Sequence, residues 1–222
     1  MTILFYTQNM EKQEIRTFGR RHGKRLSARQ AWLTEHLLPK ITPNKLIAKS
    51  DMILEIGFGA GEHLLDLAMT NPDSIVIGAE PYINGVASLL SSMTTTENAI
   101  KDEYKNIKIW PDDVRKLLSR SDINFNFSKI FILHPDPWPK ARHEKRRLLN
   151  AEFLNLLANK LKPDGQIIIG TDHHDYYDWI KEQIKKTDLI ISNSDLPIIE
   201  TRYNKKDMFG AGQTLYLTIS KN

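Results

Sequence analysis

One acidic residue, Asp136, lies between two prolines in the stretch "HPDPWP" (134–139). A residue that precedes a proline is sterically restricted toward extended backbone conformations, and His134, Asp136 and Trp138 each precede one. We therefore expect a loop with few available conformations, which presents the Asp136 carboxylate at a fixed position. Such preorganisation is useful where a carboxylate must meet a substrate at a defined geometry. The alternative is a rigid turn in which the acid is incidental.

A dense run of cations directly follows this loop, and a second cluster lies near the start of the chain. The run spans 140–147, and the second cluster lies in "RTFGRRHGKRLSARQ" (16–30), which has no clear periodicity. Clustered cations favour an anionic partner such as nucleic acid, and a solvated surface segment is the alternative for 16–30. We expect a rim that binds the phosphates of such a partner, made of Arg20, Arg21, Arg142, Lys145, Arg146 and Arg147.

A glycine-rich stretch, "LEIGFGAGEHL" (54–64), indicates a turn between a buried strand and a helix. Gly57, Gly59 and Gly61 allow a tight turn and let a ligand approach the backbone closely. A dinucleotide-binding fingerprint requires a glycine or alanine at the position of Glu62, and a carboxylate there would repel a pyrophosphate at the helix N-terminus. The Gly-x-Gly-x-Gly spacing is instead typical of sites for S-adenosylmethionine (SAM), which carries a sulfonium and no phosphate. A purely structural turn is the alternative.

Three further acids follow apolar runs that we interpret as strands. Glu80 comes about twenty residues after the glycines, where a carboxylate can accept hydrogen bonds from both ribose hydroxyls of a nucleoside. Asp112 follows the next run and could contact an adenine amino group, or it could cap the helix that follows. Asp172 follows a later run and is expected at the same edge of the sheet.

The composition excludes several kinds of site. The chain has 222 residues and no cysteine, so disulfides, thiolate catalysis and cysteine-bound metal centres are excluded. "DHHD" (172–175) holds possible metal ligands, but adjacent residues do not converge on one helix face, so we expect no metal. The chain is 41% hydrophobic and 26% charged, and it has neither a run long enough for a membrane span nor a signal-peptide pattern at its start. We expect a cytoplasmic globular protein without membrane contact.

The elements that must position these residues alternate along the chain. Strands are expected at 52–57, 74–80, 106–113, 129–134, 166–171, 189–192 and 214–219. Helices are expected near 28–38, 62–70, 82–93, 114–118, 147–161 and 174–186, with "KPDG" (162–165) as a turn. Alternation of this kind predicts an α/β fold with a doubly wound, mostly parallel seven-stranded sheet and helices on both faces. We expect a single domain over 1–222, in which 1–45 form a basic N-terminal arm and a short helix.

Five stretches occur in the order typical of one enzyme family: "LEIGFGAGEHL", "IGAEPYINGV", "FILHPDPWPKARHEKRRL", "IIIGTDHHDY" and "TRYN". In these stretches the chain resembles bacterial tRNA (guanine-N7-)-methyltransferases, and "RTFGRRHGKRL" resembles the N-terminal segment of that family. The likeness covers nearly the whole chain, and the stretch around Asp136 is far more specific than the glycine loop. The resemblance implies a Rossmann-like SAM-methyltransferase fold. It also implies transfer of a methyl group from SAM to N7 of a guanine in the variable loop of tRNA, which gives 7-methylguanosine.

The resemblance further implies roles for particular residues. It implies SAM contacts at Glu55, Glu80, Asp112 and Asp136, with Asp136 as the catalytic residue. It implies substrate contacts at Lys140, Asp172, Thr201, Arg202, Tyr203 and Asn204. The chain departs from the family at Asn204, where the family usually has Glu. Asparagine can form hydrogen bonds but offers no carboxylate to a base edge.

Other functions share some of these features. An NAD-dependent oxidoreductase on a similar sheet is disfavoured by Glu62. A non-catalytic RNA-binding protein would not need the acids at the predicted strand ends. A SAM-dependent methyltransferase that acts on another RNA, a protein or a small molecule is a further alternative, and the two basic clusters favour RNA. The sequence does not distinguish a monomer from a homodimer.

Overall fold

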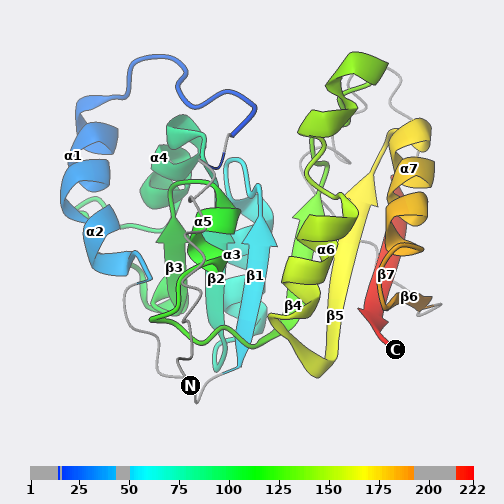
Figure 1. Ribbon diagram of the computed structural model, residues 1–222. Coiled ribbons are helices and arrows are strands. Elements are labelled where there is room, and N and C mark those ends of the chain that lie inside the picture. Colours follow the sequence, from blue (N-terminus) through cyan, green and yellow to red (C-terminus); the bar gives the residue numbers. More distant parts are fainter. Residues whose placement is uncertain (1–14, 16, 44–50, 193–213) are drawn as a thin grey trace, which may run out of the picture.

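The computed structural model describes residues 15, 17–43, 51–192 and 214–222, and it contains a seven-stranded sheet with helices on both faces (Figure 1). The strand order is β3-β2-β1-β4-β5-β7-β6. The strands β1 to β5 run parallel to one another, whereas β7 is antiparallel to both β5 and β6. The strands are β1 (Met52–Ile56), β2 (Ile75–Ala79), β3 (Ile107–Trp110), β4 (Phe127–Leu133), β5 (Leu161–Thr171), β6 (Leu189–Ser192) and β7 (Leu215–Lys221). The prediction of a mostly parallel, doubly wound α/β sheet is confirmed.

Alternate strand residues face two separate hydrophobic cores. On β1, Leu54 and Ile56 face one core while Ile53 faces the other, as the two-residue period of a strand requires. All five residues of β1 are buried, which is typical of a central strand covered on both faces. The first core is covered by α5 (Val114–Leu118), α6 (Ala151–Ala158) and α7 (His174–Ile184). The second is covered by α1 (Ala28–His36), α2 (Leu38–Ile41), α3 (Glu62–Thr70) and α4 (Ile83–Ser92).

Side-chain caps fix where several helices begin. Ser27 and Gln30 form a capping box at the start of α1. Asn150 accepts a hydrogen bond from the Phe153 N–H, so α6 begins at Ala151 and not at 147 as predicted. Two short 3₁₀ helices, η1 (Asp102–Tyr104) and η2 (Ala141–Arg146), complete the described helical segments.

The stretch 162–165 is not the separate turn that we predicted. It lies within β5, where Leu161 pairs with Phe127 but Gln166 pairs with Lys129. A step of two residues along β4 therefore corresponds to five residues along β5, and the extra residues bulge out of the ladder. The turn-forming residues at this position act inside the strand, as a bulge.

The carboxyl ends of β1 to β5 all lie at one edge of the sheet, the upper edge in Figure 1. From β1 the chain continues to β2 and β3 on one side, and then returns to place β4 on the other side of β1. This reversal leaves a crevice between the ends of β1 and β4, which is where doubly wound sheets bind ligands. The segment that precedes α1 runs along the same edge (Figure 1).

Candidate functional site

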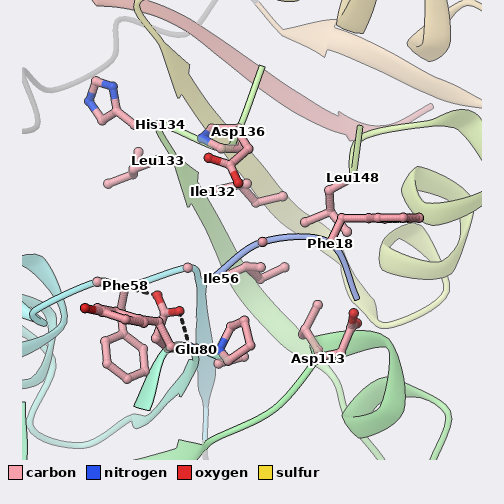
Figure 2. Close-up of a pocket in the computed structure, with 18 of the residues that line it drawn as sticks. Phe18, Ile56, Phe58, Glu80, Asp113, Ile132, Leu133, His134, Asp136 and Leu148 are labelled. Carbon is pink, nitrogen blue, oxygen red and sulfur yellow. Dashed lines mark hydrogen bonds between the residues drawn. The ribbon is translucent and has the colours of Figure 1, made fainter. Parts of the chain in front are cut away.

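A cavity of about 980 Å³ opens at this edge of the sheet, a volume that suits a small-molecule ligand. Its walls come from segments that are far apart in the sequence: the loops after β1, β2, β3, β4 and β5, the stretch between η2 and α6, and the segment 17–20. Figure 2 shows the aromatic and aliphatic side chains and the three acids that are labelled in this cavity. The lining residues with polar or acidic side chains include Thr17, Glu55, His63, Glu80, Asp113, Asp136 and Asp172.

Glu80 holds the glycine-rich loop in place (Figure 2). It is 8% exposed, and its two oxygens accept hydrogen bonds from the N–H groups of Gly59, at 2.9 Å, and Tyr82, at 2.8 Å. Burial raises the pKa of Glu80, the two hydrogen bonds lower it, and the nearby Asp136 and Glu55 raise it further, so the net direction is upward. The carboxyl thus anchors the loop and remains at the cavity wall.

The glycine loop adopts backbone conformations that only glycine adopts readily. Gly57, Gly59 and Gly61 have φ angles of 76°, 56° and 90°. A Cβ added at Gly57 or Gly59 would meet no atom within 4 Å, so the backbone there borders open space. A Cβ added at Gly85 on α4 would lie only 2.3 Å from the Gly59 carbonyl oxygen. The loop is therefore open toward the cavity and tightly packed on α4 behind it.

Glu55 presents a buried carboxylate oxygen to the cavity. It is 3% exposed, and its Oε1 lies 3.2 Å from Nδ1 of His63 at the start of α3. Its Oε2 is buried and has no hydrogen-bond partner among the described residues. Burying an acceptor without a partner costs free energy, so this oxygen is suited to a cationic or N–H donor from a ligand. His63 packs edge-on against Phe131, with 5.0 Å between the ring centroids.

The two neighbouring acids after β3 have different surroundings. Asp113 lines the cavity, caps α5 through the Arg115 N–H, and binds the Arg115 side chain at 2.6 Å. Asp112, the residue predicted to contact adenine, pairs with Arg21 at 2.8 Å and with Lys116 at 2.7 Å. Burial opposes ionisation of Asp112, but the hydrogen bond from Lys116 and the other contacts outweigh this and lower its pKa. The capping role thus belongs to Asp113, and Asp112 stands just outside the cavity wall.

The loop that carries Asp136 is strained, but not in the way that we predicted. His134 and Trp138 do not adopt extended conformations, because their φ angles are 51° and 43°, in the left-handed region. Such angles are unfavourable for residues with a Cβ and persist only where surrounding contacts hold them. The His134 N–H donates to the Gly170 carbonyl at 2.7 Å, which ties the loop to β5. Asp136 itself is solvent-exposed in the open cavity (Figure 2), and desolvation by the protein around it raises its pKa.

The segment 17–21 crosses the cavity mouth, which the sequence did not reveal. The Thr17 hydroxyl donates to Asp113 at 2.9 Å, and Phe18 lies in the cavity wall (Figure 2). The Arg146 guanidinium stacks on Phe18 and Trp138, with its Cζ 5.4 Å and 4.9 Å from the ring centroids. An aromatic residue within a basic segment was the available signal for Phe18, but its contact with Trp138 through Arg146 depends on long-range folding.

The predicted phosphate-binding residues divide into three groups. Arg20 and Lys145 are exposed and line the cavity, Arg142 is exposed on η2 but is not among the lining residues, and Arg21 is exposed but paired with Asp112. Arg146 is half-buried between the two aromatic rings. Arg147 differs from the other cations, because it is only 5% exposed and its side chain is buried among protein groups at the cavity wall.

The predicted substrate-binding residues are only partly brought together. Asp172 lines the cavity at the end of β5, whereas Lys140 is exposed at the start of η2 and is not among the lining residues. Thr201, Arg202, Tyr203 and Asn204 lie outside the described residues. In the part of the chain that the structure describes, no three His, Asp or Glu side chains are grouped as metal ligands, and no helix is long and apolar enough to span a membrane.

Solved structures with a similar fold are methyltransferases. The 16S rRNA methyltransferase KamB superposes with a TM-score of 0.53, at 14% identity, over 85% of this chain and 93% of that one. A precorrin-6y C5,15-methyltransferase from Geobacter metallireducens superposes with a TM-score of 0.50, at 15% identity, over 83% and 84% of the two chains. These likenesses show that the chain shares its α/β fold with these two methyltransferases.

Sequence comparison identifies the family more closely. Residues 49–206 match the family described as "Putative methyltransferase". A tRNA (guanine-N(7)-)-methyltransferase from Neorickettsia sennetsu is 37% identical over 88% of this chain and 87% of its own length. The enzyme of the same name from Wolbachia pipientis wMel is 45% identical over 64% of this chain and 61% of its own length. The chain belongs to the tRNA (guanine-N7-)-methyltransferase family, as the resemblance in the sequence implied.

Proposed function

We propose that this protein transfers the methyl group of SAM to N7 of a guanine in tRNA, giving 7-methylguanosine in the variable loop. One observation carries the proposal: Glu55, Glu80 and Asp136 converge on one cavity whose mouth is edged by exposed cations. Family membership supports the same reaction, because the relatives are named for methylation of guanine N7 in tRNA.

The cavity fits SAM on structural grounds. The partnerless Oε2 of Glu55 suits the cationic amino group of the methionyl part, and the open backbone at Gly57 and Gly59 leaves room for the ligand. We assign to the Glu80 carboxylate, at the cavity wall, the hydrogen bonds from the ribose hydroxyls. Asp112 remains our proposed contact for adenine. SAM, when bound, supplies an electrophilic methyl group on a positively charged sulfur.

The protein's own contribution is positioning and charge. Guanine N7 is a hydrogen-bond acceptor with an available lone pair, so its attack requires no prior removal of a proton. The main task of the protein is therefore to place the base in line with the methyl group. Binding in this geometry lowers the barrier because the translational and rotational entropy of the reactants is lost before the reaction step. The base gains positive charge as the reaction proceeds, and the Asp136 carboxylate can stabilise that charge or hold the base through its N–H groups. Because desolvation raises the pKa of Asp136, its charged form is favoured only at higher pH, and activity should rise with pH through that ionisation.

Substitution of Asp136 tests the assignment. Asp136→Asn keeps the size of the side chain and removes its charge, so methyl transfer to unmodified tRNA should fall by about 10²–10³-fold. The dissociation constant of SAM, measured by calorimetry, should change much less. Full activity in the variant would contradict the catalytic role, and an equal loss of SAM binding and turnover would assign Asp136 to the cofactor instead.

A tRNA analogue tests the acceptor atom. A transcript in which 7-deazaguanosine replaces guanosine has carbon at position 7 and no lone pair there. It should accept no methyl group, while the guanosine transcript of the same sequence does. Equal labelling of both transcripts would rule out N7 as the acceptor.

A further inference from the structure

The loop that presents Asp136 needs contacts that hold it, because two of its residues have left-handed backbone angles. His134 and Trp138 flank the segment, and Pro135 and Pro137 lack N–H groups with which they could bond to neighbouring strands. The carbonyl of Pro137 is bonded, however, and its donor is Nε of Arg147, at 2.9 Å. This bond holds the carbonyl of the residue that directly follows Asp136.

Arg147 is fixed in turn by the helix that follows β5. Its guanidinium lies over the rings of Tyr176 and Trp179 on α7, with Cζ 5.3 Å and 5.0 Å from the ring centroids. Its Nη1 lies 3.6 Å from the carboxylate of Glu144, one turn earlier in the chain. A flat guanidinium can donate to a carbonyl and stack on aromatic rings at once, which a lysine ammonium cannot do.

We infer that Arg147 is a positioning residue that clamps the Asp136 loop to α7, and that it does not bind tRNA phosphates. The inference rests on the proposed function, because the position of Asp136 affects methyl transfer only if Asp136 takes part in that reaction. α7 begins two residues after Asp172, so the clamp joins the loop after β4 to the start of the helix after β5. It thereby fixes the position of Asp136 relative to Asp172 across the cavity.

The burial of Arg147 separates it from the cations that face solvent. Its side chain is 4% exposed, so a phosphate could reach it only if the guanidinium left both rings and the Pro137 carbonyl. Arg142, five residues earlier, is exposed. The two arginines belong to the same cationic run and are therefore a matched pair for comparison.

Three kinds of measurement on Arg147→Met and Arg142→Met test the inference: steady-state kinetics with tRNA, the salt dependence of tRNA binding, and hydrogen exchange of the backbone N–H groups in 132–138. For Arg147→Met we expect kcat to fall by about 10²-fold, because a misplacement of about 1 Å in a reacting group can cost that much. The KM for tRNA and the slope of log Kd against log salt should stay near the wild-type values. Hydrogen exchange of the N–H groups in 132–138, measured without SAM or RNA, should be faster than in the wild-type protein.

Arg142→Met should show the opposite pattern, with a higher KM for tRNA, a shallower salt slope and unchanged hydrogen exchange in 132–138.

Three milder variants keep the test informative if Arg147→Met does not fold. Arg147→Lys retains the charge but not the flat stacking group, so it should lose kcat nearly as strongly as the methionine variant. Trp179→Leu removes one stacking face from α7 and should lower kcat several-fold with unchanged salt slope, whereas Trp179→Phe should remain close to the wild type.

The outcomes separate this inference from the proposed function. A shallower salt slope with unchanged kcat in Arg147→Met would overturn the inference and make Arg147 a phosphate contact. Full kcat in Arg147→Lys would also overturn it. Failure of the wild-type protein to methylate tRNA would instead contradict the proposed function, and the exchange measurement would still report whether Arg147 holds the loop.

Discussion

Burial of Glu80 couples the stability of the protein to the protonation of one carboxyl group. Its pKa is higher in the folded protein than in the unfolded chain, because burial and the neighbouring acids disfavour its charge. The folded protein therefore binds this proton more tightly than the unfolded chain does. The contribution of Glu80 to the free energy of unfolding falls as the pH rises from the unfolded-state pKa through the folded-state pKa.

Glu80→Gln tests this coupling through the melting temperature at several pH values. The amide keeps one acceptor oxygen but not two, so the variant should melt at a lower temperature at pH 4. As the pH rises toward 7, the difference from the wild type should shrink, since only the wild type loses stability by ionising there. A difference that grows with pH would contradict a raised pKa.

Asp51→Asn serves as a control of opposite sign. Burial opposes the charge of Asp51, but hydrogen bonds from Lys162 and Ser128 outweigh this and lower its pKa. The stabilisation from that charge is present at neutral pH and is lost as the pH falls through the folded pKa. The deficit of Asp51→Asn should therefore persist between pH 7 and pH 4 and shrink only as the pH falls below 3.8.

At the scale of elements, α4 supports the glycine loop by close backbone contact. Gly85→Ala would place a methyl group 2.3 Å from the Gly59 carbonyl oxygen, which forces the loop or the helix to move. Overpacking of this kind costs about 1–3 kcal/mol, so we expect the melting temperature to fall by about 5 °C and SAM to bind more weakly. Scanning calorimetry and binding calorimetry measure the two effects. Ser88→Ala, on the same helix, should change neither; unaltered SAM affinity in Gly85→Ala would contradict the packing argument.

Local sequence patterns predicted most elements, since strands and helices here follow hydrophobic periodicity and caps. The predicted range 62–70 for α3 and 189–192 for β6 coincide with the observed bounds. The predictions that were wrong depend on contacts between distant segments. "KPDG" became a bulge because β4 pairs on both sides of it, and His134 and Trp138 are held in left-handed conformations that proline alone does not favour.

The roles of individual cations could not be read from charge alone. Arg142 and Arg147 look alike in the run 140–147, but only the folded chain brings Tyr176 and Trp179 over Arg147. Likewise, the closeness of Phe18 to Trp138 requires the segment before α1 to return across the sheet edge. The acids at strand ends were predictable, because parallel strands bring their carboxyl ends to one edge.

At the scale of the whole molecule, exposed cations lie at or near a cavity that is lined by several acids. Replacing Arg20, Arg142 and Lys145 together by Gln should weaken tRNA binding and flatten its salt dependence. If each of them contacts one phosphate, the slope of log K against log salt should become shallower by about 2. Filter binding or fluorescence anisotropy at several salt concentrations measures the slope.

Lys186→Gln is the control for this charge effect. Lys186 is exposed beyond the end of α7, away from the edge of the sheet that carries the cavity. Its replacement should leave the slope unchanged. The placement of tRNA over the cavity mouth would be contradicted if the triple variant kept the wild-type slope, or if Lys186→Gln reduced it equally.

At the same scale we also propose that residues 1–222 act as one methyltransferase domain with 1–45 as its arm. Leu33, Leu38 and Ile41 of α1 and α2 pack into the same core as α3 and α4, which supports this for the described part of the arm.

The central claim is the site of methylation, and mapping it tests the account most directly. Unmodified tRNA is incubated with the protein and SAM labelled in its methyl group, and the RNA is then cleaved chemically at 7-methylguanosine. The account predicts one labelled guanine in the variable loop, cleavage at that position, and neither signal with Asp136→Asn. Label on another base, on another atom of guanine, or on no RNA at all would contradict it.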